Sequence, residues 1–167
     1  MNATHLHLIL NHIPVLGTIF GMGLLILAIG KKSTELAQAS MWVFLLAALI
    51  ALPVYFSGEP AEDLTKGLPG FSEQIVEQHE AAANLAFTSV LLLGAAGLAG
   101  FIWLQRAKAL PQWLGLMLLA GSLIVSGLMA WTANKGGQIR HTEIRSGTTT
   151  APESLDRTES ISGKPPA

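Results

Sequence analysis

Four long apolar runs constrain this chain more than any other feature. A helix needs about 20 apolar residues to cross a bilayer, and four stretches reach that length without a Lys, Arg, Asp or Glu inside them. The runs extend from about Leu8 to Ile29, Ala37 to Phe56, Ala81 to Leu104, and Leu110 to Ala133. Tryptophan and tyrosine stand near several ends of these runs, as in an interfacial aromatic belt. We therefore predict an all-α protein, an integral membrane, up-and-down four-helix bundle in contact with the lipid bilayer.

The chain divides into one membrane domain and one tail. Residues 1–145 contain all four runs, whereas residues 146–167 are rich in Ser, Thr, Pro and charge and predict a flexible polar segment. The first run follows no Lys/Arg-rich region and precedes no small-residue cleavage site, so we expect it to be retained as a spanning helix.

The connections between the runs predict an orientation. The two short connections are basic and contain Lys31, Lys32, Arg106 and Lys108, whereas the longer middle connection is acidic. Positive charge in short loops marks the cytoplasmic side. Both termini and the acidic loop are therefore expected on the opposite, non-cytoplasmic side.

The composition excludes several kinds of site. The chain has no cysteine, which excludes disulfides, iron–sulfur clusters, thiolate metal sites and covalently attached c-type haem. Its net charge of -1 gives no indication of a nucleic-acid partner.

All five histidines are predicted at one face of the membrane. His5, His7 and His12 open the first run, His79 precedes the third, and His141 follows the fourth. An ionisable side chain inside a membrane span is a candidate functional group. His12 lies deepest in apolar sequence and is the strongest candidate of the five.

These histidines predict haem b, because a neutral imidazole is a standard axial ligand and a helical bundle a standard haem site. His12 with His79 is the preferred axial pair, and His7 with His141 is the candidate pair for a second haem. Counting about 1.5 Å per residue places His12 about 27 Å and His79 about 36 Å from the far ends of upright helices. Because those depths differ, a pairing of His5 with His79 stays open.

The residues around these histidines allow two interpretations each. Asn11 and Asn84 either hold an imidazole tautomer or form a hydrogen bond between helices. Arg140 either meets a haem propionate or faces solvent and lipid headgroups. Pro14 removes a backbone hydrogen bond near Leu10 and predicts a kink there.

Two other chemistries use the same side chains. His12, His79, His7 and His141 are candidate ligands for copper or zinc, which also take imidazole. Zinc prefers a compact cluster of three or four ligands, and these histidines are spread over three helices. Proton handling by the histidines is the other alternative.

The opening LHLILNHIPVLG resembles that of a widespread family of small bacterial four-helix membrane proteins of unknown function. That family opens with His, four residues, and His-Phe-Pro, which match His7, His12 and Pro14 here, with Ile13 in place of Phe. HEAAAN is similar to the histidine and asparagine at the start of the family's third helix, although its spacing is one residue longer.

The end of the last run carries the rest of this resemblance. GGQIRH, residues 136–141, is similar to the family's closing Gly-Gly and Arg-His, in a shorter version. The resemblance covers residues 6–145 and implies the four-helix topology and the bacterial inner membrane. It implies no activity. A looser likeness to membrane b-type cytochromes is one of architecture.

Three functions follow from these observations. The first is a haem b electron-transfer protein that passes electrons between quinol and an external acceptor. The second is a non-catalytic subunit that anchors or stabilises a larger respiratory or transport complex. The third is a metal- or proton-handling membrane protein. The sequence leaves open whether the chain is an enzyme.

Overall fold

The computed structural model describes residues 3–63, 66 and 70–145. They form helices and connecting turns, so the all-α prediction is confirmed. The predicted tail, residues 146–167, lies outside the described residues. The helices are α1 (Ala3–Leu10), α2 (His12–Lys31), α3 (Thr34–Phe56), α4 (Gly58–Asp63), α5 (Glu73–Ala107), α6 (Gln112–Arg140) and the short 3₁₀ helix η1 (Thr142–Ile144).

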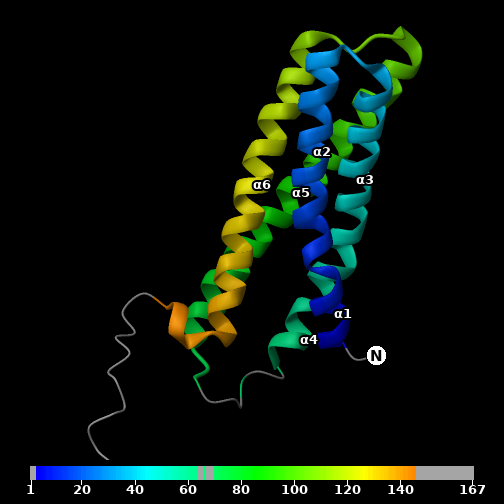
Figure 1. The fold of residues 1–167 in the computed structure, drawn as a ribbon. Helices are drawn as coiled ribbons and strands as arrows, with labels where there is room; N and C mark the ends of the chain where they lie inside the picture. The colour runs from blue at the N-terminus through cyan, green and yellow to red at the C-terminus, as the bar shows by residue number, and fades with distance from the viewer. Residues whose placement is uncertain (1–2, 64–65, 67–69, 146–167) are drawn as a thin grey trace, which may run out of the picture.

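Among the described residues, four helical segments are long and apolar enough to span a membrane, which confirms the predicted four-helix bundle. They are His5–Lys31, comprising most of α1 with α2, and the helices α3, α5 and α6. In Figure 1 the four run up and down, and α5 crosses behind the others from lower left to upper right. Contacts join α2 to α3, α3 to α5, α5 to α6, and α6 back to α2. α1 and α4 pack together at the lower end beside α3.

Glycines allow the central helices to approach closely. A Cβ built on Gly94 of α5 would lie 2.4 Å from Cβ of Ala48 in α3, and one on Gly97 would lie 3.2 Å from the Met41 backbone oxygen. Gly21 of α2 similarly accommodates the ring of Phe44, which is fully buried. This close backbone packing is typical of membrane bundles, where small residues replace the hydrophobic effect as the basis of helix association.

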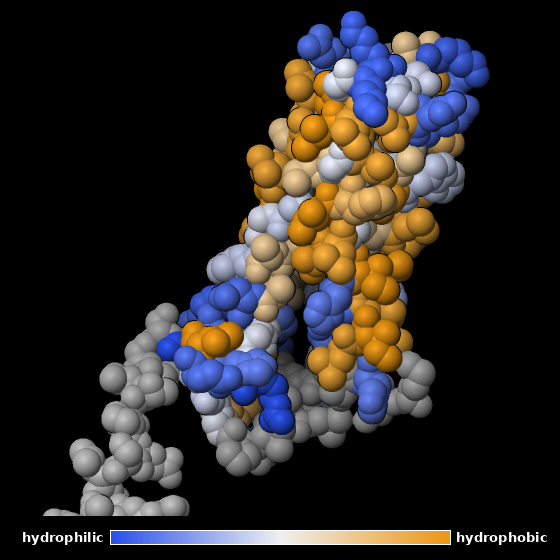
Figure 2. Space-filling model, in the orientation of Figure 1, coloured by the Kyte–Doolittle hydropathy of each residue, from blue (hydrophilic) through white to orange (hydrophobic). Residues whose placement is uncertain are grey.

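The outer surface is that of a lipid-facing protein. Leu16, Leu92 and Ile124 are each more than 60% exposed, although they lie near the middle of spanning helices. Figure 2 shows hydrophobic residues over the central part of the bundle and hydrophilic residues at both ends. Such a surface buries its apolar area against acyl chains. The chain is therefore a multi-pass membrane protein in contact with the bilayer.

Two helices are longer than the apolar runs predicted. α5 begins at Glu73 rather than near Ala81, and α6 continues to Arg140 rather than ending near Ala133. Their polar ends pack against each other beyond the apolar zone, where Lys135 Nζ donates to Gln78 Oε1 at 2.8 Å. A hydropathy profile cannot locate these polar helical turns, because it measures how favourably residues transfer into lipid and not whether they form a helix in water.

The first span changes from α1 to α2 at Asn11, close to the point where the proline predicted a kink. α1 ends at Leu10, α2 begins at His12, and Asn11 between them is a turn residue whose N–H donates to the His7 oxygen at 2.9 Å. Pro14 lacks the N–H that would continue the ladder to Leu10. The break separates His7 on α1 from His12 on α2.

Candidate histidine site

His7 is held against the end of α3. Its ring is half-buried, and Nδ1 lies 3.0 Å from the Val54 oxygen and 3.3 Å from Ser57 Oγ. A carbonyl oxygen only accepts, so Nδ1 carries the proton and donates it, which leaves the lone pair of the neutral ring on Nε2. The Cβ position of Gly58 lies 3.7 Å from Cε1 of this ring, an ordinary contact distance.

His79 is held in the same way between α5 and α6. Its ring is half-buried, and Nδ1 donates to the Thr132 oxygen at 3.1 Å. A Cβ on Gly136 would lie 3.0 Å from Cε1 and 3.3 Å from Nδ1 of the ring. The first glycine of GGQIRH therefore provides space for this imidazole. As in His7, the lone pair of the neutral ring is on Nε2, the arrangement that histidine ligands usually have.

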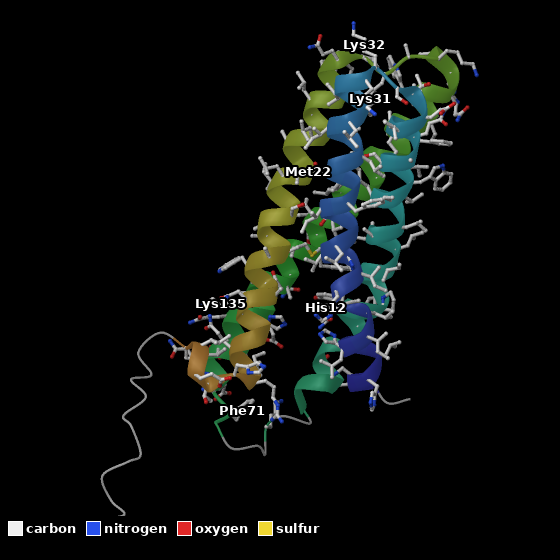
Figure 3. All side chains as sticks on the ribbon, viewed as in Figure 1. His12, Met22, Lys31, Lys32, Phe71 and Lys135 are labelled. Atoms are coloured by element: carbon white, nitrogen blue, oxygen red, sulfur yellow. The ribbon has the colours of Figure 1, made fainter. Side chains whose placement is uncertain are left out.

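His12 differs from both. It is the first residue of α2, its side chain is exposed, and no hydrogen bond to its ring is found in the described part of the chain. Figure 3 shows it at the lower end of α2, on the side toward α6. Because it belongs to the span His5–Lys31, its imidazole lies in an apolar stretch of sequence without a protein partner. Such a group is costly unless something else satisfies it.

Residue counts along α2 and α6 place His12 and His79 at similar distances from the opposite end of the bundle. At about 1.5 Å per residue, His12 is about 29 Å from Lys31, and Thr132, which accepts from His79, is about 30 Å from Gln112 at the same end. The larger difference in depth between His12 and His79 that upright helices predict was obtained by counting residues along α5. That helix runs obliquely in Figure 1, so its length overstates the depth of His79.

The lower end of the molecule is open between its two sides. Figure 2 shows a hollow between the end of α6 and the junction of α1 with α2, and hydrophilic residues border it on both sides. Another hollow of about 350 Å³ lies against α5 and is lined by Lys66, Phe71, Glu73, Val76, Glu77 and Glu80. The three glutamate carboxylates of this hollow outnumber its one cation, Lys66, so the hollow would repel the negatively charged propionates of a haem. The opening beside His12 is the better candidate site.

The remaining candidates lie at the edge of the site. His5 and Arg140 are exposed. His141 Nδ1 is 2.8 Å from Glu143 Oε1, with 63% and 59% of the two side chains exposed. The Glu143 backbone N–H, and then the hydrogen bond with His141, hold the pKa of this carboxyl below its usual range. No described contact joins His141 to His7, the two residues predicted to form a second pair.

The two asparagines have different roles. Asn84 Oδ1 accepts from Tyr55 Oη, so of its two interpretations the structure shows the bond between helices, α3 to α5. Asn11 Oδ1 is buried and has no hydrogen-bond partner in the described structure. It stands next to His12, at the break between α1 and α2.

The chemistry of the donors decides which groups fit. Within the described residues, no three His, Asp or Glu side chains gather as they would around a metal ion. A site for zinc, which needs three or four protein ligands, is therefore not formed by these residues alone. Haem iron needs only two axial ligands, because the porphyrin supplies the other four.

Sequence reasoning missed the acceptors that orient the rings. Both are backbone oxygens, those of Val54 and Thr132, and a backbone oxygen has no sequence signature. The one available signal was Gly136, which lies one helical turn after Thr132 and opens the space for His79.

The fold and the site define a multi-pass, four-helix membrane protein with its histidines gathered at one end. No family model, curated protein or solved structure matches the chain. The resemblance to the bacterial four-helix family therefore stays a prediction.

Proposed function

We propose that this protein is a b-type haem electron-transfer protein of the bacterial inner membrane, with His12 and His79 as the axial pair. The observation that carries the proposal is the contrast between these two rings. His79 has Nδ1 fixed on the Thr132 oxygen, while His12, at a similar level by residue count, is an exposed imidazole without a protein partner in the described chain. A ligand at His12 would satisfy a group that the protein leaves unsatisfied.

The residues present fit this group. The donors are imidazoles, no thiolate is available, and two ligands on different helices are sufficient. The hollow in Figure 2 lies between the α6 side and the α1–α2 side, and His79 and His12 are the residues that would hold the group there. Arg140 is exposed at the same end of α6 and is the candidate partner for a propionate.

Haem would supply the one-electron chemistry, and the chain's residues would position and tune it. The Thr132 oxygen fixes the orientation of the His79 ring and increases its basicity as a ligand. Gly136 would contribute by leaving space for the His79 ring, because a Cβ there would lie 3.0 Å from Cε1. His7, fixed by Val54, is the candidate ligand for a second centre, with His141 as its proposed partner.

The proposal includes partners and an orientation. Lys31 and Lys32 end α2, and Arg106 and Lys108 end α5, opposite the histidines, and these four cations would face the cytoplasm. Both termini and the histidine site would then face the periplasm. Electrons would pass between quinol in the bilayer and an external acceptor on that side.

Single alanine variants test the axial pair. We expect His12→Ala and His79→Ala each to lose bound haem, measured by the pyridine haemochrome assay on purified protein. His5→Ala is the matched control, because His5 is exposed on the same segment and is expected to keep its haem. If both His12→Ala and His79→Ala keep full haem content and an unchanged reduced spectrum, the pairing is wrong. If all five histidine variants do so, the function of an anchoring or stabilising subunit replaces the haem proposal.

A further inference from the structure

The end of the bundle opposite the histidines carries a group of unpaired cations. Lys31 and Lys32 end α2, and Arg106 and Lys108 end α5; all four are exposed. None of them forms a hydrogen bond or an ion pair with another residue that the structure describes. Figure 3 shows Lys31 and Lys32 at this end, far from Lys135 at the other.

The two basic turns are packed against each other. Leu104 of α5 is 1% exposed and lies with Ala28 and Ala37 in one buried cluster, against which Leu110 packs. Ile29 lies beside Gly115 and Leu110, so the end of α2 meets the start of α6. The four cations therefore share one rim, and the only acidic residue in the adjoining turns is the exposed Glu35.

Two of the lysines occupy a backbone conformation that favours glycine. Lys32 has φ 52° and Lys108 has φ 60°, and they are the only described non-glycine residues with positive φ. Glycine is the usual residue at such a helix end, because a Cβ is strained there. Compared with glycine, lysine at both positions is strained but adds a positive charge, which indicates a functional role for the charge.

An apolar surface lies directly below this rim. Trp103 of α5 and Trp113 of α6 are 48% and 57% exposed, and their rings meet edge to face with centroids 6.5 Å apart. Both are within about two turns of Lys108 along the chain. Exposed indole rings at this depth are suited to the boundary between headgroups and acyl chains.

We propose that this end binds an anionic phospholipid. Its phosphate lies among Lys31, Lys32, Arg106 and Lys108, and its acyl chain lies along Trp103 and Trp113. Charge complementarity supports a lipid phosphate, since four cations face one carboxylate. The tryptophan pair supports a lipid over a soluble anion, because a soluble anion has no acyl chain for it to contact. This inference is independent of haem.

Lipid-dependent thermal stability tests the proposal. Purified protein in neutral detergent is titrated with phosphatidylglycerol, phosphatidylcholine or inorganic phosphate, and the melting temperature is followed. We expect phosphatidylglycerol alone to raise it, with an effect that weakens as salt increases. The double variant Arg106→Gln/Lys108→Gln should bind about 25-fold more weakly, at about fivefold per cation. Lys135→Gln, at the opposite end, should bind as the wild type does.

Lys32→Gly keeps the test decisive if the double variant fails to fold. Glycine relieves the strain at positive φ, so this variant should melt higher than the wild type in neutral detergent and gain less from phosphatidylglycerol. An equal gain with phosphatidylcholine overturns the proposal, as does an equal gain with inorganic phosphate, which would indicate a site for a free anion. An equal loss of binding in Lys135→Gln also overturns it, because only net charge would then matter.

Discussion

Replacing Gly94 by alanine tests the packing that holds α3 against α5. The added Cβ would lie 2.4 Å from Cβ of Ala48 and 3.3 Å from the Phe44 backbone oxygen. Apolar carbons rest about 3.5–4.0 Å apart, so the two helices must separate by about 1 Å. Neither obstructing atom can move by a change of rotamer, because one is a Cβ and the other is backbone.

The expected cost follows from these contacts. Overpacking of a core typically costs about 1–3 kcal/mol, and the rigid neighbours place Gly94→Ala at the upper end of that range. Alanine gains up to about 1 kcal/mol over glycine in a helix, which leaves a net loss of about 2 kcal/mol. Gly127→Ala in α6 is the matched control, because nothing lies within 4 Å of its Cβ position. It should be neutral or more stable by up to about 1 kcal/mol.

Unfolding in mixed micelles measures both variants. The protein is titrated with SDS in a mild detergent, and the four tryptophans report the transition by fluorescence. Gly94→Ala should unfold at a lower SDS fraction than the wild type, and Gly127→Ala at the same or a higher one. Equal stability of Gly94→Ala and the wild type would refute the close packing of α3 on α5, and so would an equal loss in Gly127→Ala.

Three further predictions concern single groups. Ser40→Ala removes the 2.8 Å hydrogen bond from Ser40 Oγ to the Gly21 oxygen, and should lower the free energy of unfolding by about 0.6 kcal/mol in the SDS titration. Ser126→Ala is the control and should leave the stability unchanged, because the buried Ser126 Oγ lacks a partner in the described structure. Equal losses of stability in the two variants would contradict this prediction. Gly136→Ala should displace the His79 ring and lower haem content, whereas Gly137→Ala, with only an ordinary 3.6 Å contact to Ile144, should not; equal haem content in the two would contradict the role given to Gly136. The pKa of Glu143 is lowered in the folded protein, so its ionised form stabilises the η1 turn. This contribution is fully present at pH values above the unfolded-state pKa. It is lost as the pH falls through the lower folded-state pKa. Carboxyl NMR should give a midpoint below that of the same residue in an unfolded peptide, and His141→Ala should raise it; an unchanged midpoint would contradict the pairing.

The sequence was sufficient for the architecture because lipid imposes a strong pattern. Uncharged apolar runs locate the spans, and Pro14 locates the break between α1 and α2. The start of α5 and the end of α6 could not be predicted from hydropathy. The turns there are polar and lie beyond the apolar runs, so they carry no pattern of lipid exposure. The run from Ala81 thus gave no indication that the helix begins at Glu73.

The candidate site was only partly predictable. The gathering of the histidines at one end follows from the topology, and the sequence therefore indicated it. The separate environments of His7 and His79 depend on backbone oxygens of Val54 and Thr132, which any residue type provides. The depth of His79 depends on the oblique course of α5, which is a property of packing and not of residue count.

An absorption spectrum of the purified wild-type protein tests the central claim most directly. The protein is prepared from cells supplied with a haem precursor, and the spectrum is recorded before and after reduction with dithionite. We predict a Soret band that shifts on reduction and sharp α and β bands, as for a low-spin b-type haem with two imidazole ligands. A colourless protein under these conditions would contradict the account.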